Sequence, residues 1–188
     1  MALLDTPICD FGQALPVFAL KDAAGEAFDS GALMGAKGLV VVFMCNHCPY
    51  VKTLIGRLAA DARVLQAEGV NVVGIMSNDY TNYPEDAPDK MLAFSAAHDL
   101  SFPYLVDETQ AVGQTFGAVC TPDFFGYNAA GELQYRGRLD NIGMNGDAMN
   151  GDTSNRVPEL VNAMQLVAKT GQGPRQQTPS MGCSIKWR

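Results

Sequence analysis

The stretch "VVFMCNHCPYVK" (41–52) decides how the rest of the sequence is interpreted. In it Cys45 and Cys48 stand three positions apart, directly after an apolar run and directly before a helical pattern. The run "GLVVVFM" (38–44) is rich in β-branched residues, as in a strand buried on both faces. After Pro49 the apolar residues recur at spacings of three and four, which predicts one buried face of a helix. The cysteine pair is therefore predicted to lie where a buried strand becomes a helix.

A second buried strand, "VNVVGIMS" (70–77), follows that helix, and Gly69 marks the helix end. Strand, helix and strand in this order predict a βαβ unit with parallel strands. Further along, "DFFGYNAAGELQYRGRLD" (123–140) predicts a β-hairpin. The other predicted elements are two short strands around Gly25 (16–30), a helix (90–100), a short strand (103–107), a helical segment (109–118) and a last helix (156–170).

Length and charge restrict the class of protein. With 188 residues the chain fits one domain with a full core, and its net charge is -7 without any run of lysine or arginine. Binding to nucleic acid or to an anionic membrane surface needs a basic patch, so neither is predicted. No apolar stretch is long enough to cross a bilayer. The N-terminal residues contain no basic leader, which predicts a cytoplasmic protein.

The chain has five cysteines, an odd number, and a cytosolic chain of this size does not need structural disulfides. Closely spaced cysteines in such a protein are more often catalytic or metal-binding. A thiol at a helix N-terminus loses its proton more easily, and the thiolate is the reactive form. We therefore expect Cys45 to be the more acidic, attacking thiol, and Cys48 to resolve the mixed disulfide. His47 either stabilises a thiolate directly or is a solvent-facing residue that only tunes the motif.

Other interpretations of the same residues stay open. The cysteine pair could be two core thiols or half of a zinc site, although the sequence has no second paired motif. A copper site built from the two cysteines and a histidine is a further alternative, and so is a docking domain without turnover. Oxygen-bearing residues in a later loop suit calcium by type but not by spacing, so a solvated loop is the default; they are Asp140, Asn145, Asp147, Asn150 and Asp152. No metal and no organic cofactor are predicted.

The pair resembles the active-site motif of the thioredoxin fold, which is C-x-x-C at a strand-to-helix junction. "VCTPDFF" (119–125) is similar to the cis-proline loop that faces the cysteines in that fold, which predicts a cis peptide between Thr121 and Pro122. "CNHC" also resembles the motif of protein disulfide isomerase, which carries a histidine in the same slot. The resemblance implies an α/β domain with a central mixed sheet and helices on both faces.

Over nearly its whole length the chain is similar to a bacterial group of peroxiredoxin-like proteins with a CNHC motif, related to alkyl hydroperoxide reductase and thiol-specific antioxidant. The matching segments are "CNHCPYVK" (45–52), "SNDYTNYPEDAPDKM" (77–91), "FPYLVDETQAVGQTFGAVCTPDFF" (102–125), "YRGRLD" (135–140) and "GCSIKW" (182–187). One departure is the peroxidase signature Pro-x-x-x-Thr/Ser-x-x-Cys. Counted back from Cys48, its slots hold Val41 and Cys45; counted back from Cys45, they hold Gly38 and Val42.

The resemblance implies a thiol-disulfide oxidoreductase that acts on protein or small-molecule thiols and disulfides. Cys45 and Cys48 would be catalytic, and Cys183 is a candidate third redox thiol that could also be only packed. The remaining candidates tune the motif or shape the substrate groove: Asn46, His47, Pro49, Cys120, Thr121 and Pro122. For Cys120 a redox role and simple packing are both open. A weak thiol peroxidase and a copper or zinc module are the alternatives.

The C-terminal tail is the last feature that the sequence singles out. We expect a thioredoxin-like domain over residues 1–170 and a tail over 171–188 that docks on it. Ile185 and Trp187 would hold "MGCSIKW" (181–187) on the domain, because burying each side chain is worth about 1.5–3 kcal/mol. The polar "QGPRQQTPS" (172–180) would be a looser connector.

Overall fold

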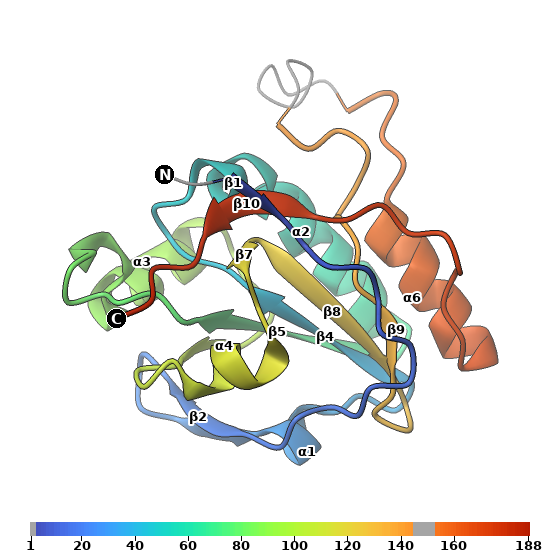
Figure 1. Ribbon diagram of the computed structural model, residues 1–188, viewed down its shortest axis with the longest axis horizontal. Coiled ribbons are helices and arrows are strands. Elements are labelled where there is room, and N and C mark those ends of the chain that lie inside the picture. Colours follow the sequence, from blue (N-terminus) through green and yellow to red (C-terminus); the bar gives the residue numbers. More distant parts are fainter. Residues whose placement is uncertain (1–2, 145–152) are drawn as a thin grey trace.

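The apolar run forms β4 (Gly38–Phe43), whose residues are all buried and which lies at the centre of the molecule. In the computed structural model, which describes residues 3–144 and 153–188, β4 pairs in parallel with β5 (Val70–Met76) and antiparallel with β8 (Asp123–Asn128). The full seven-stranded sheet has the order β3-β2-β6-β5-β4-β8-β9 (Figure 1). Its other strands are β2 (Ala19–Asp22), β3 (Ala27–Asp29), β6 (Tyr104–Val106) and β9 (Leu133–Tyr135).

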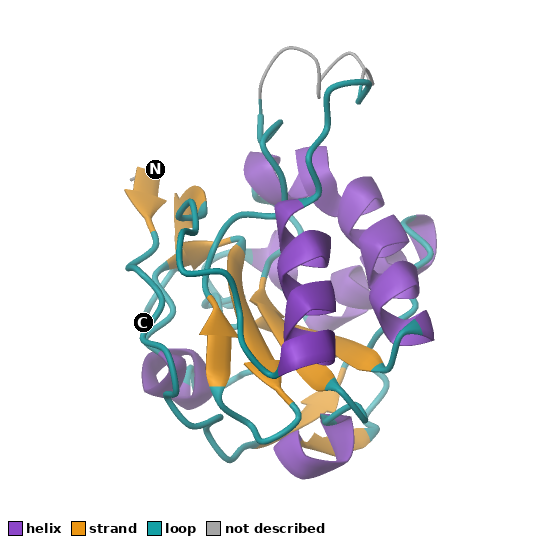
Figure 2. Cartoon of the chain, turned by 90° about the vertical axis from the view of Figure 1, so that its right-hand side faces the viewer, coloured by secondary structure: helices purple, strands orange, loops and turns teal. Residues whose placement is uncertain are grey.

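Helices cover both faces of this sheet, as predicted (Figure 2). Alternate residues of β4 point to opposite faces. Val40 and Val42 pack in one core cluster with apolar residues of α2 and α6, whereas Leu39, Val41 and Phe43 pack in another with residues of α1 and α4. The helices are α1 (Ser30–Leu33), α2 (Pro49–Ala67), η1 (Pro84–Asp86, a 3-10 turn), α3 (Pro88–Ala97), α4 (Ala111–Phe116) and α6 (Glu159–Thr170). Within the described residues, no helix is both long and apolar enough to cross a membrane.

The boundaries of three elements differ from the predicted ones, and prolines set two of these boundaries. Pro88 occupies the first turn of α3, so this helix starts two residues before the predicted position. Pro158 is the residue before α6, which therefore begins at Glu159 and not at Arg156. In the predicted hairpin the second strand, β9, ends at Tyr135, well before residue 140.

A second, three-stranded sheet joins both ends of the chain to the residues before Pro122. Its order is β1-β10-β7, with β1 (Leu3–Asp5), β10 (Met181–Ser184) and β7 (Cys120–Thr121). Figure 1 shows the red β10 between the dark blue β1 and the yellow β7. The sequence does not predict β1, because its three residues are exposed and only backbone pairing holds them.

The C-terminal segment lies on the rest of the chain, although not in the predicted way. Ile185 is buried, but Trp187 keeps 39% of its surface exposed and contributes less than expected. The prediction of a loose connector is wrong, because the Gln177 side chain both accepts from the Arg136 N–H and donates to the Gln134 carbonyl. The side-chain amide of Gln177 therefore bonds to Gln134 in β9 and to Arg136, the residue directly after β9. The division at residue 170 stays a prediction.

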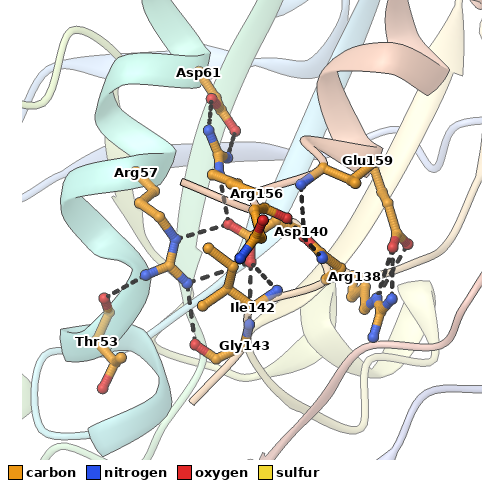
Figure 3. Close-up of polar contacts among 12 residues, drawn as sticks. Thr53, Arg57, Asp61, Arg138, Asp140, Ile142, Gly143, Arg156 and Glu159 are labelled. Atoms are coloured by element: carbon orange, nitrogen blue, oxygen red, sulfur yellow. Dashed lines mark hydrogen bonds and ion pairs between the residues drawn. The ribbon is translucent and has the colours of Figure 1, made fainter. Parts of the chain in front are cut away.

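An ion-pair network fastens the segment after β9 to the long helix α2 (Figure 3). The buried Asp140 accepts from Arg57 Nε at 2.7 Å and from Arg156 Nε at 2.8 Å. Arg156 also pairs with Asp61, one turn further along α2. Asp140 additionally accepts from two backbone N–H groups, those of Ile142 and Gly143. The network therefore holds α2, which begins at the cysteine pair, against Asp140 and Arg156 in the segments between β9 and α6.

Removal of Asp140's charge tests this network. In Asp140→Asn two arginines lose a buried anionic partner, and loss of one member of such a pair typically costs about 3–5 kcal/mol. We expect urea unfolding to show a decrease in the free energy of unfolding in this range. Asp99→Asn is the matched control, because Asp99 pairs with Arg63 in solvent. Equal effects of the two substitutions would contradict the role given to Asp140.

Truncation before Met181 tests the docking of β10. It removes the central strand of the three-stranded sheet and the buried Ile185, whose burial alone is worth about 1.5–3 kcal/mol. The melting temperature should fall, as followed by circular dichroism. Unchanged stability of the truncated chain would rule out a stabilising role for this segment.

Candidate active site

The cysteine pair lies at the end of β4, and the helix starts at a different cysteine from the one expected. Cys48 is the N-cap residue of α2, and Pro49 is its first helical residue. Proline suits this position, because its missing N–H would have no partner in the helix and its φ is already helical. Cys45 lies outside the helix, in the segment between β4 and the N-cap residue Cys48. The free N–H groups of the helix therefore point to Cys48.

Cys48 has no exposed surface and is surrounded by groups that donate hydrogen bonds. As a thiol it donates to the Thr121 carbonyl at 3.2 Å. As a thiolate it accepts from the Cys45 thiol, from Thr121, from the Val51 backbone N–H and from the Cys183 thiol. The bond from Cys45 is the largest of these effects, and together they outweigh burial and lower the pKa of Cys48 to about 5. An ordinary thiol has a pKa of about 8.5.

Cys45 lies in surroundings that raise its pKa, which is the opposite of the effect that its place in the sequence predicts. Its sulfur is 1% exposed and lies 3.5 Å from Thr121 Oγ1. Three effects raise the pKa of Cys45: it gives its proton to the bond with Cys48, it is buried, and it faces the negative charge of Asp86. These contacts favour a charge on Cys48, which caps the helix, and a proton on Cys45.

Asp86, in η1, organises the loop between the two cysteines. Its side chain is fully buried, and Oδ1 accepts from the backbone N–H groups of Asn46 and His47 at 2.8 and 3.2 Å. Oδ2 accepts from Asn78 Nδ2 at 2.8 Å and lies 2.7 Å from His47 Nδ1. This contact raises the pKa of His47, against the effect of burial. Sequence reasoning missed Asp86, which lies in a polar loop with several similar residues.

Asn46 and His47 are held from further sides. Asn46 Nδ2 donates to the Glu85 carbonyl at 3.0 Å, and Asn46 Oδ1 accepts from the Tyr104 hydroxyl at 3.1 Å. The Tyr83 ring stacks on the His47 ring with centroids 5.6 Å apart. Asn46 therefore serves to fix the loop. His47 is partly buried and paired, so it is not a free solvent-facing side chain.

The loop with Pro122 faces the pair, and the predicted cis peptide between Thr121 and Pro122 is confirmed. Thr121 contacts both cysteines, through Oγ1 to Cys45 and through its carbonyl to Cys48. Cys120 instead donates to the Pro122 carbonyl at 3.5 Å, and burial raises its pKa. Between the two interpretations of Cys120, these contacts favour packing.

A cavity of about 560 Å³ opens beside the Pro122 loop. Tyr50 and Leu54 of α2 line one side, and Pro122 and Met181 line another. The lining is mostly apolar, and the Pro179–Ser180 segment closes it toward the C-terminal strand. Of the residues predicted to tune the motif or shape the groove, Pro122 alone lines this cavity, so the groove stays a prediction.

One group of side chains in the described part of the chain has the composition of a metal site. Ligand atoms of Cys45, His47 and Asp86 lie within 4.8 Å of one another. Both oxygens of Asp86 already accept hydrogen bonds, including one with His47 Nδ1, so a metal ion would have to replace these contacts. The calcium-type residues Asn145, Asp147, Asn150 and Asp152 lie outside the described residues, and Asp140 instead binds two arginines.

Comparison with known proteins identifies the family of this chain. Residues 11–136 match the AhpC/TSA family. An uncharacterised conserved protein from Geobacillus kaustophilus is 34% identical, with a TM-score of 0.90, over 100% of this chain and 97% of that one. A hypothetical protein from Sinorhizobium meliloti is also 34% identical, with a TM-score of 0.88, over 98% and 97%.

A more distant structure shares the fold alone. It is a secreted disulfide oxidoreductase from Mycobacterium tuberculosis, 22% identical, with a TM-score of 0.56, over 73% of this chain and 95% of that one. Among curated proteins, none matches the chain.

Replacement of Asp86 tests its effect on His47. In Asp86→Asn the imidazolium loses its anionic partner, and burial, which lowers the pKa of His47, then acts without opposition. We expect the His47 ring to titrate at lower pH than in the wild type, as followed by NMR, with the second histidine of the chain, His98, as an internal reference. An unchanged His47 titration would show that the contact with Asp86 does not stabilise the imidazolium.

Proposed function

The chain belongs to the AhpC/TSA family, and we propose that it is a thiol-disulfide oxidoreductase. The observation that carries this proposal is the position of two buried cysteines at the start of α2, where each contacts Thr121 of the Pro122 loop. A thiol beside a thiolate is the arrangement needed for disulfide exchange, because the second sulfur can displace whatever the first one captures.

The roles of the two cysteines are the reverse of those expected from the sequence. Cys48 attacks, because with a pKa of about 5 it is a thiolate at neutral pH. Its sulfur bonds to one sulfur of a substrate disulfide, and the other sulfur leaves as a thiolate. Cys45 then attacks Cys48 and forms the Cys45–Cys48 disulfide. The second substrate sulfur leaves with the proton of Cys45, so two substrate thiols form for each disulfide reduced.

His47 and Asp86 support this exchange without reacting. Asp86 raises the pKa of His47 and so favours its protonated form, which places a positive charge beside the pair. Asp86 also disfavours a thiolate at Cys45 and so leaves the charge on Cys48. The charges of His47 and Asp86 therefore favour Cys48 over Cys45 as the attacking thiolate.

The substrates proposed are protein or small-molecule thiols and disulfides, and the electrons come from another thiol system. The cavity beside Pro122 combines apolar side chains with the charged Asp5, Arg138 and Asp140, and its size supports an extended substrate. Disulfide exchange between sulfur atoms requires no organic cofactor. The cytoplasmic location stays a prediction.

Two other activities are separated from this one by direct measurement. A peroxidase would react rapidly with hydrogen peroxide in stopped flow, which we do not expect because Cys45 and Val41 occupy the slots of the signature threonine and proline. A copper or zinc module would retain metal through purification without chelator. Binding of stoichiometric metal, with His47 and Cys45 protected, would favour that alternative.

Alkylation of the reduced protein against pH tests the proposed roles. At pH 6 Cys48, with a pKa of about 5, is mostly thiolate and should be labelled by iodoacetamide faster than Cys45. Its labelling rate should fall by half near pH 5. Mass spectrometry of peptides that separate the two residues in Cys45→Ser and Cys48→Ser variants gives each rate. Faster labelling of Cys45 would restore the roles predicted from sequence.

Turnover itself is measured with a small disulfide. The wild type, kept reduced by dithiothreitol, should reduce 2,2'-dithiodipyridine or insulin disulfides faster than the Cys48→Ser variant by at least about tenfold, since an activated nucleophile is lost. Cys9→Ser is the control, because Cys9 lies outside the pair and burial raises its pKa to about 11. Equal activity of wild type and Cys48→Ser would exclude the proposed chemistry.

A further inference from the structure

The position of Cys183 is fixed by the pairing of β10 with β7. Cys183 lies opposite Thr121 in this antiparallel pair, and Ser184 lies opposite Cys120. Side chains of directly opposite residues project from the same face of a sheet, whereas successive residues alternate. Cys183 therefore shares a face with Thr121, the residue that contacts both cysteines of the pair. Cys120 projects to the other face.

The approach of β10 to this loop is unusually close. A Cβ atom on Gly182 would lie 2.1 Å from the Thr121 carbonyl oxygen, so only glycine permits this contact. The same carbonyl accepts from Cys48. β10 therefore packs directly against the Thr121 carbonyl oxygen, which is also the atom that accepts from Cys48.

Contacts on both sides of Cys183 keep its strand in place. Before it, Ser180 is hydrogen-bonded with Thr6 in both directions. After it, the Ile185 N–H donates to the Val119 carbonyl, and the Lys186 N–H donates to Asn78 Oδ1 at 2.9 Å. The thiol is therefore supplied by an ordered strand and not by a mobile tail.

The outcome is a group of three thiols centred on Cys48. Cys45, Cys48 and Cys183 belong to the same buried core cluster. Burial and the interaction with Cys48 raise the pKa of Cys183 to about 11, and the same interaction helps to lower the pKa of Cys48. Cys183 is 6% exposed, whereas Cys45 and Cys48 are 1% and 0% exposed. Cys183 is thus the member of the group with most contact with solvent.

We propose that Cys183 is a redox thiol that forms a disulfide with Cys48. This rests on the proposed function. After Cys48 has bonded to one sulfur of an external disulfide, Cys183 attacks Cys48, the substrate sulfur leaves, and the proton of Cys183 leaves with it. Cys45 attacks the Cys48–Cys183 bond in turn, forms the Cys45–Cys48 disulfide and transfers its proton to Cys183. Each step exchanges one sulfur–sulfur bond for another, and the external disulfide takes both electrons.

Both donors attack the same sulfur atom, so Cys48 is bonded to only one of them at a time. The strand can then move away from the pair only when Cys48 is not bonded to it. The pairing of β10 with β7 places Cys183 on the same face as Thr121, beside the pair. No other cysteine has this position, because Cys120 turns to the Pro122 carbonyl and Cys9 lies outside the group.

Oxidation of variants by 2,2'-dithiodipyridine, all carrying Cys9→Ser, tests the proposal. In Cys45→Ser we expect release of two thiopyridone molecules and a Cys48–Cys183 disulfide, which peptide mapping by mass spectrometry identifies. In Cys45→Ser with Cys183→Ser we expect loss of the second release and a stable mixed disulfide at Cys48. Adding Cys120→Ser to Cys45→Ser is the matched control, and it should leave the Cys48–Cys183 disulfide unchanged.

The wild type, quenched with acid at early times, provides a measurement that needs no substitution in the group. We expect a Cys48–Cys183 disulfide to appear before the Cys45–Cys48 disulfide. A Cys45–Cys48 disulfide in the wild type, together with a free Cys183 and a persistent mixed disulfide in Cys45→Ser, would overturn this proposal and leave the proposed function intact. Absence of any reaction at Cys48 in the wild type would overturn both.

Discussion

The hydrogen-bonding surroundings of the buried Cys48 sulfur are the constraint on which the candidate site depends. Burial alone makes a thiolate unfavourable, so the charge persists only where several donors point at it. Cys48 obtains them from three directions: the start of α2, the Thr121 residue before Pro122, and the two neighbouring thiols. None of these donors lies in the same element as another. The charge therefore requires the central sheet, the helix and the C-terminal strand to be in place together.

The loop between the two cysteines has the opposite electrostatic character. Here a buried carboxylate, Asp86, accepts backbone N–H groups that no helix uses and balances the His47 imidazolium. A charge on Cys45 would face this carboxylate directly, whereas Cys48 faces the helix end. Two thiols three residues apart thus have different proton affinities because one is turned toward an anion and the other toward helix N–H groups. The asymmetry of the motif arises from its surroundings and not from the cysteines.

Much of the fold could be predicted from the sequence because its strongest signals are local. The β-branched run of β4, the periodic face of α2 and the proline after Thr121 each predict their own structure. The proton affinities could not be predicted, because they depend on which residue caps α2, and a shift of three residues reverses the answer. Asp86 was missed because its role is defined only by the folded contact with residues some forty positions away in the chain. The connector before β10 was misjudged because Gln177 replaces backbone pairing with side-chain bonds that a polar sequence does not reveal.

The placement of β10 has a consequence for the order in which the molecule is built. The βαβ core and the Pro122 loop are synthesised well before Cys183 leaves the ribosome, and local contacts form sooner than distant ones. A growing chain can therefore hold a nearly complete thiol pair whose outer face is still open. During that interval Cys48 lacks one donor and the shelter of the strand, so the nascent protein is more open to oxidants than the finished one. The final strand completes the protection of a site whose chemistry is already present.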